Sequence, residues 1–244
     1  MKTNIFAYLS MMLLSIAMVV VTGCQNDDTP TIPGNDEESS KFGTFHNEVI
    51  KNIFDKLPSS LSRSNDGTVT ISAIKEVCVE EATVSVLAKD AKLQYEPSKM
   101  TIAEVSSQTV ESIQNAMSNE DREVVDGIVS LINQGSSLKT IKDFIAQCNL
   151  PNNKKEAAYN FLDTYISSKQ YWEDNGAEWI DYINANVIVE TGSRSSWYDR
   201  VSWGNVAFSD AYYAWYGTLS SGCNVYVGAG AAAVGSVASV LNQL

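Results

Sequence analysis

The stretch from Val225 to Leu241 reads VYVGAGAAAVGSVASVL and decides the fold. No charged side chain occurs in it, or anywhere between Ala211 and Leu244. On a helix, small residues would form one face and larger apolar residues another: Gly228, Ala231, Gly235 and Ser239 against Val227, Val234, Val237 and Leu241. A helix that is apolar on every side must be surrounded by other elements. We therefore predict an all-α protein with a Gly/Ala-rich buried C-terminal helix.

A membrane role is the alternative for the same stretch. Small residues four positions apart also let helices approach closely in membranes, and about 20 uncharged residues can span a bilayer. Ser220-Ser221-Gly222 divides the uncharged end into two apolar halves, which is the pattern of an αα-hairpin. The alternative function is thus a membrane-active or self-associating protein that uses this glycine-rich C-terminal helix.

The rest of the chain also shows the periodicity of helices. Apolar residues recur at helical spacing over residues 45–57, 70–86, 101–116, 119–134, 137–148, 151–172, 179–187 and 197–219. A strand is the rival interpretation for 70–86, which is rich in valine. Pro58 is expected to stop the first helix, and Thr101 to Glu104 to form a capping box. The short connections predict an antiparallel multi-helix bundle of seven to nine helices over residues 42–244.

Aromatic residues concentrate just before the uncharged end. Four tryptophans, interleaved with carboxylates, are candidate ligand-contact residues together with Asp210: Trp172, Trp179, Trp197 and Trp203. Flat rings beside carboxylates suit sugars, so a glycan-binding or glycan-acting protein is a third hypothesis. The simpler interpretation is that the rings pack in a helical core. Asp210 is expected to be solvated or bonded at a helix end; if buried, it would need partners or a raised pKa.

Signs of an enzyme are absent from the sequence. The chain has one histidine, His46, so multi-histidine zinc sites are excluded. We expect His46 to lie near an N-terminal tether, residues 24–41, and to make a hydrogen bond that fixes the start of its helix. No GxSxG, GxxxxGK[ST] or GxGxxG motif occurs. We therefore predict no catalytic residue, no metal and no cofactor, and the formal net charge of −12 argues against a nucleic-acid partner.

The N-terminus has the features of an export signal. Lys2 precedes an uncharged apolar run over residues 5–21, which ends in Val21-Thr22-Gly23-Cys24. This arrangement resembles a bacterial lipobox. The resemblance implies that residues 1–23 are a signal peptide and that Cys24 is acylated. Residues 24–41, which contain prolines and acidic side chains, would then form a flexible tether to the lipid bilayer.

The residues after Cys24 indicate where in the cell the protein is located. Gln25-Asn26-Asp27-Asp28 resembles the acidic export signal of Bacteroidetes surface lipoproteins. With the Phe45-His46-Asn47 stretch and the Gly/Ala-rich end, the chain resembles helical lipoproteins of that group. The resemblance implies an outer-membrane lipid anchor at the cell surface, with a periplasm-facing anchor as the alternative, and carries no activity with it.

The leading functional hypothesis is therefore a non-enzymatic binding or interaction module with a protein or glycan ligand. Once Cys24 is acylated, three cysteines remain, so at most one disulfide can form: Cys78, Cys148 and Cys223.

Overall fold

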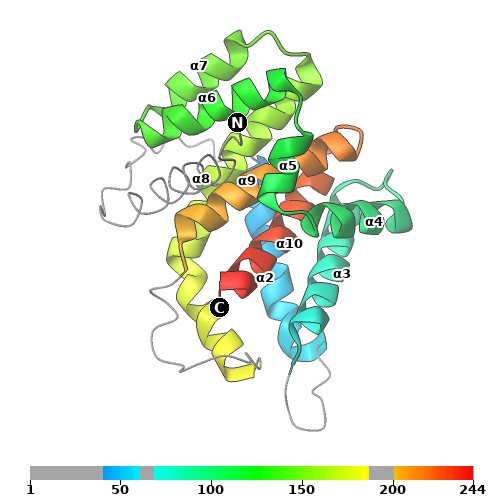
Figure 1. Cartoon of the computed structure of the whole chain (residues 1–244). Coiled ribbons are helices and arrows are strands. Elements are labelled where there is room, and N and C mark those ends of the chain that lie inside the picture. Colours follow the sequence, from blue (N-terminus) through cyan, green and yellow to red (C-terminus); the bar gives the residue numbers. More distant parts are fainter. Residues whose placement is uncertain (1–40, 61–68, 187–200, 244) are drawn as a thin grey trace, which may run out of the picture.

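The computed structural model describes residues 41–60, 69–186 and 201–243, and within these ranges the chain forms nine α-helices (Figure 1). They are α2 (Lys41–Ser60), α3 (Ile71–Lys89), α4 (Tyr95–Ser106), α5 (Val110–Ala116), α6 (Asn119–Asn133), α7 (Leu138–Gln147), α8 (Asn152–Asn186), α9 (Trp203–Ser220) and α10 (Val225–Gln243). The all-α multi-helix bundle is confirmed. The valine-rich segment 70–86 is helical, and Thr70 caps it by accepting a hydrogen bond from the Ala73 N–H.

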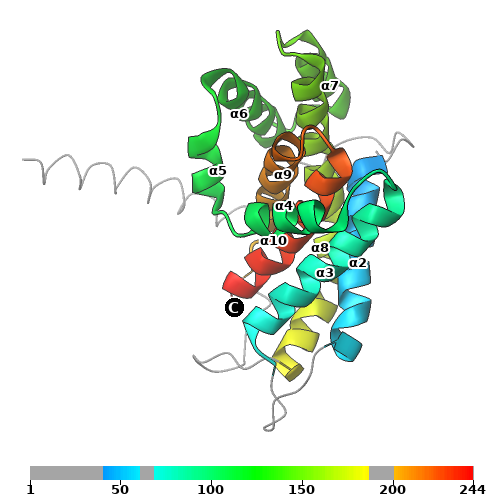
Figure 2. The ribbon, with the colours of Figure 1, turned by 90° about the vertical axis from the view of Figure 1, so that its right-hand side faces the viewer.

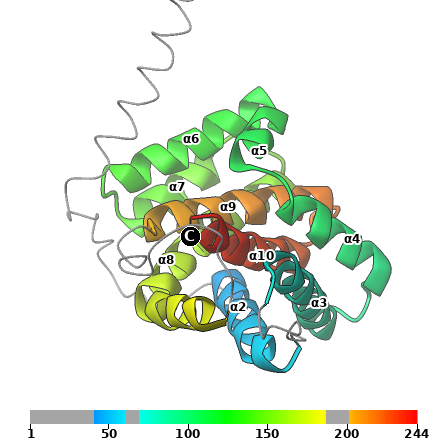
Figure 3. The same ribbon diagram turned by 60° about the horizontal axis from the view of Figure 1, so that its bottom comes forward.

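The last two helices lie at the centre of the molecule. α10 is flanked by α9 on one side and by α2, α3 and α4 on the other (Figure 3). By length and composition α10 could cross a membrane, but 83% of its apolar 18-residue window is buried inside the bundle. Glycine allows this packing, because a Cβ on Gly217 would lie 3.0 Å from the Cα of Gly228. The predicted buried C-terminal helix is thus confirmed in the fold.

α8 is a helix of 35 residues that runs along much of the molecule (Figures 1 and 2). It contributes residues to two apolar clusters. Its second half packs with α2, α3 and α10 in one cluster. Its first half packs with α6, α7 and α9 in the other. The sequence predicted two helices over 151–172 and 179–187, and the structure joins them. Gly176 lies inside α8, and the ring of Trp203 covers it: a Cβ there would lie 2.6 Å from that ring.

Two predicted helix boundaries are wrong. α2 continues through Pro58 to Ser60, since a proline in the last turn removes a single backbone hydrogen bond. Thr101 lies inside α4, where its hydroxyl donates to the Pro97 carbonyl oxygen over 2.9 Å. The helix starts earlier, at Tyr95, because Pro97 falls in its first turn, where proline is tolerated. The cap in this region is Thr109, which begins α5, so the expected helix over 101–116 is two helices.

Other helix ends are set by residues close to them in the sequence. Ser118 caps α6 and Ser137 caps α7, each through its side-chain oxygen. Gly135, with φ of 67°, follows α6 in the left-handed conformation that ends many helices. α9 begins at Trp203, so the helix expected from residue 197 does not include Val201 and Ser202; residues 197–200, with Trp197, lie outside the described residues.

Candidate functional site

Asp210 lies in the middle of the fold with no exposed surface. It is the one charged residue of α9. The Ser168 hydroxyl of α8 donates to Oδ2 of Asp210, and the Ser236 hydroxyl of α10 donates to the same oxygen over 2.6 Å. Ser236 in turn accepts a 2.7 Å hydrogen bond from Nε1 of Trp172. The expectation of a solvated or cap-bonded aspartate is wrong, because α9 starts seven residues earlier and turns this position toward α8 and α10.

His46 completes this group from α2. It is also fully buried, and its Nε2 lies 3.6 Å from Oδ2 of Asp210. The expected role near the tether is wrong, because His46 makes a tertiary contact across the core. It shares a helix face with Ile50 and Ile53, four and seven residues later, both fully buried. We call these five residues the Asp210 cluster: His46, Ser168, Trp172, Asp210 and Ser236.

Burial dominates the protonation of the cluster. Burial raises the pKa of Asp210 to about 7, although the hydrogen bonds from Ser168, Ser236 and Trp172 act in the opposite direction. Burial lowers the pKa of His46 to about 4, against the effect of its hydrogen bond with Asn47. The arrangement differs from a nucleophile triad, since both serine hydroxyls point to the carboxylate and neither is activated by the imidazole.

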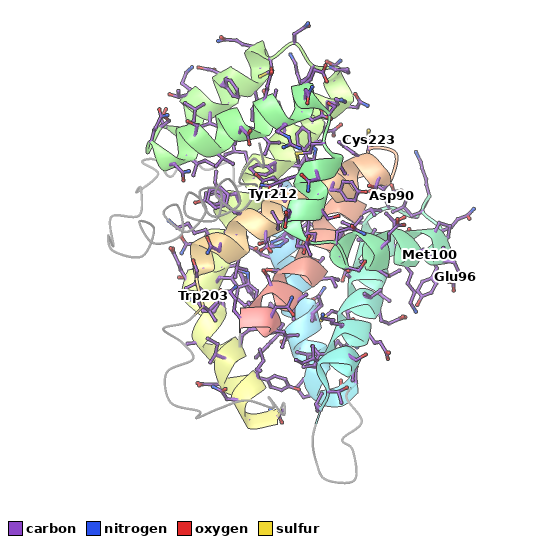
Figure 4. The ribbon with its side chains drawn as sticks, viewed as in Figure 1. Asp90, Glu96, Met100, Trp203, Tyr212 and Cys223 are labelled. Atoms are coloured by element: carbon purple, nitrogen blue, oxygen red, sulfur yellow. The ribbon has the colours of Figure 1, made fainter. Side chains whose placement is uncertain are left out.

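The structure places three of the four candidate tryptophans near one another. Trp172 and Trp179 have 0% and 1% exposure, so neither ring reaches a soluble ligand in this fold. Trp203, at the start of α9 beside α8 (Figure 4), is half-buried and stacks on Trp172 with ring centroids 5.5 Å apart. Trp172 is joined to Asp210 through Ser236. These rings therefore act in core packing, while the Asp210 cluster anchors them.

A separate hollow opens between α3, α4, α9 and α10 and reaches the start of α5. Its volume is about 970 Å³. We call it the α3–α10 hollow. Hydroxyl or amide groups come from Ser72, Ser106, Ser107, Gln108, Thr109, Ser209, Tyr213, Ser239 and Asn242; charges from Lys75, Glu76, Glu80 and Lys99; and apolar surface from Val77, Val79, Ala103, Val110, Val234 and Ala238.

The charges of the α3–α10 hollow balance. Nζ of Lys99 lies 2.8 Å from a carboxylate oxygen of Glu80. The hydrogen bond between them lowers the pKa of the Glu80 carboxyl and raises the pKa of the Lys99 ammonium. Several hydroxyls are already used as donors: Ser107 donates to the Glu104 carbonyl oxygen and Tyr213 to that of Gln108. Their oxygen lone pairs remain as acceptors. Such a lining suits a ligand with little net charge, hydrogen-bond donors and an apolar part.

Of the two sites, only the Asp210 cluster has a weak signal in the sequence. Asn160, Thr164 and Ser168 precede Trp172 at intervals of four, a polar row on α8 that is buried throughout. That spacing could have indicated a polar strip in the core. The α3–α10 hollow is assembled from five helices, so no local pattern reveals it.

Metals and thiols add no further site. Among the residues that the structure describes, no group of three or more His, Cys, Asp or Glu side chains could hold a metal ion. Cys78, Cys148 and Cys223 are free thiols. Comparisons of the chain with protein-family models, with curated proteins and with solved structures found no match.

Proposed function

We propose that this chain is a lipid-anchored binding module of the bacterial cell envelope. Acylated Cys24 holds it at the outer membrane, the acidic tether carries the helical domain away from the bilayer, and the α3–α10 hollow binds the ligand. The observation that supports this proposal is the hollow itself, because a volume of about 970 Å³ with mixed polar and apolar lining matches the size range of ligand pockets.

The anchoring half of the proposal rests on the sequence around Cys24. The first described helix begins at Lys41, where the tether was expected to end, so a spacer of about 17 residues separates acyl chains and domain. A Cys24→Ala variant should move from the membrane fraction to the soluble fraction, whereas Ser39→Ala in the tether should stay with the membrane. Protease treatment of whole cells should digest the wild-type chain if it faces outward. A Cys24→Ala chain that still sediments with membranes would contradict the anchor.

The burial of α10 favours binding over membrane insertion. Releasing the α9–α10 hairpin would expose Asp210 and its partners and remove the centre of both apolar clusters. That opening costs the burial of a whole helix. We therefore propose that the hairpin is a structural part of the module.

Filling the α3–α10 hollow tests the binding half. Ala103 lines it and Ala177 is exposed on α8 away from it, so Ala103→Trp and Ala177→Trp form a matched pair. We expect neutral oligosaccharides or short uncharged peptides to raise the melting temperature of the wild type and of Ala177→Trp, but not of Ala103→Trp. The class that binds decides between glycan and peptide. If neither class shifts the wild type, or if Ala103→Trp binds equally well, the proposal fails.

A further inference from the structure

His46 and Asp210 approach each other in a part of the core that water does not reach. Both side chains have no exposed surface, and Nε2 of His46 lies 3.6 Å from Oδ2 of Asp210. Within the described part of the chain, His46 Nε2 and Asp210 Oδ1 have no hydrogen-bond partner. Buried polar atoms in this state are rare, because each one costs free energy. Because both of these atoms lack a partner, the protonation of the His46 ring and of the Asp210 carboxyl must be explained together.

The neighbouring amide decides which nitrogen of His46 carries hydrogen. The Asn47 side-chain nitrogen donates to the Ser167 carbonyl oxygen over 2.9 Å, so Oδ1 of Asn47 is left to accept. That oxygen lies 2.9 Å from Nδ1 of His46, which must therefore be the N–H. In a neutral ring, Nε2 is then a bare lone pair facing the carboxyl group. If Asp210 were ionised as well, lone pairs would face each other, whereas one proton on the pair removes the conflict.

In the described part of the chain, the charged side chains near this part of α2 and α8 pair with other charged side chains. α10 carries no charged residue, and on α9 Tyr213, which interacts electrostatically with Asp210, has its pKa raised by burial to about 12. On α8, Lys169 and Glu173 pair with each other at 3.6 Å. On α2, Glu48 pairs with Lys89 of α3 at 3.0 Å. The charged residues of α4 and α5, which also touch α9, are exposed or paired at the surface: Glu96, Lys99, Glu104 and Glu111.

We propose that packing of α9 and α10 against α2 and α8 moves one proton from His46 to Asp210, so that the pair is buried as a neutral acid beside a neutral imidazole. The N–H bond at Nε2 breaks and an O–H bond forms on the carboxyl group, with no other reactant. In an unfolded chain the pKa of histidine is higher than that of aspartate, so histidine is the stronger base and holds the proton. Burial reverses this order, because desolvation raises the pKa of Asp210 and lowers that of His46.

The consequence is a core whose stability does not respond to this proton over mildly acidic pH. Between about pH 4 and 6.5, the pair holds one proton when folded, on Asp210, and one when unfolded, on His46. Folding then neither takes up nor releases a proton at this site. Either residue alone would break the balance. Each would make the unfolding constant change about tenfold per pH unit, in opposite directions.

The single histidine allows a direct test on the intact wild-type chain. Nitrogen chemical shifts of the His46 ring at about pH 5.5 should show a neutral ring with hydrogen on Nδ1, and the ring should titrate only near pH 4. A charged ring at that pH would show an ion pair with Asp210 and overturn the proposal. So would titration near the ordinary histidine pKa of about 6.5.

Two substitutions test the compensation independently. Relative to wild type, the unfolding constant of Asp210→Asn should fall about tenfold per pH unit as pH rises from about 4 to 6.5. That of His46→Gln should rise about tenfold per unit over the same range, and the double variant should follow wild type. Parallel pH profiles for the two single variants would overturn the proposal. If one variant does not fold, the other and the ring shifts still decide it.

Discussion

Gly217 of α9 and Gly228 of α10 face each other across the helix contact at the centre of the fold, and a Cβ on Gly217 would lie 3.0 Å from the Cα of Gly228. A Cβ on Gly228 would meet the Ala214 carbonyl oxygen at 2.6 Å. The contact is made by backbone, which cannot move aside as a flexible side chain does. The two helices of the uncharged C-terminal hairpin, α9 and α10, are therefore shaped to pack closely against each other.

Gly228→Ala should destabilise the protein by about 1–3 kcal/mol or more, because the new methyl group forces α9 and α10 apart. Chemical denaturation measures the change. Gly204→Ala is the control, since nothing lies within 4 Å of a Cβ there, and it should leave stability unchanged or raise it by up to about 1 kcal/mol. Equal effects at both glycines would contradict the close packing.

Ser236→Ala should weaken the fold more at about pH 8 than at about pH 5. The variant removes a donor to Asp210 and the acceptor of the Trp172 N–H, a loss of about 1–3 kcal/mol. Stability from a carboxyl with a raised folded pKa is present below its unfolded pKa and is lost as pH rises through the folded value of about 7. Without Ser236 that folded pKa rises further, so the loss grows with pH. Ser239→Ala, on the same helix, should show no such pH dependence; a constant loss for Ser236→Ala would argue against the role of Asp210.

Gly176→Ala should displace Trp203 from its place over α8. A Cβ there would lie 2.6 Å from the Trp203 ring, which stacks on Trp172. We expect increased quenching of tryptophan fluorescence by acrylamide, because Trp203 is pushed toward solvent. Ala177→Gly, at the exposed neighbour, should leave quenching unchanged. Unchanged quenching in Gly176→Ala would mean that Trp203 does not lie over Gly176.

Cys78 should resist thiol reagents in the folded protein. Burial raises its pKa to about 12, so almost no thiolate exists at about pH 8. Labelling followed by mass spectrometry should modify Cys223, in the turn between α9 and α10 (Figure 4), and leave Cys78 unmodified until denaturant is added. Labelling of Cys78 at the rate of Cys223 would show that the α3 face is open.

Helical periodicity predicted most of the fold, and several helix ends also have local signals. Caps such as Thr70 and Ser137 and the left-handed Gly135 act through neighbours in sequence, so they can be recognised without the tertiary structure. The predicted cap at Thr101 is wrong because a threonine hydroxyl can donate to a backbone carbonyl inside a helix as readily as it can cap the start of a helix. The anchor at Cys24 lies outside the described residues and stays a prediction.

The candidate sites were harder to predict because they depend on which faces meet. From the sequence, the first helix is expected over residues 45–57, with His46 near the tether. Its register with Ile50 and Ile53 puts it in the core. From the sequence, Asp210 is expected to be solvated or bonded at a helix end, yet its partners Ser168 and Ser236 lie on other helices, 42 and 26 residues away in the chain. Such pairings become visible only when three helices are assembled.

The most direct test of the account removes α10. A chain that ends at Ser220 loses the helix on which both apolar clusters converge, while a chain that ends at Leu241 keeps it. Circular dichroism with denaturant should show cooperative unfolding for the longer chain and no cooperative transition for the shorter one. If the shorter chain keeps its helical signal and unfolds cooperatively, the C-terminal helix is a separable element, and its role as the buried centre of the fold is wrong.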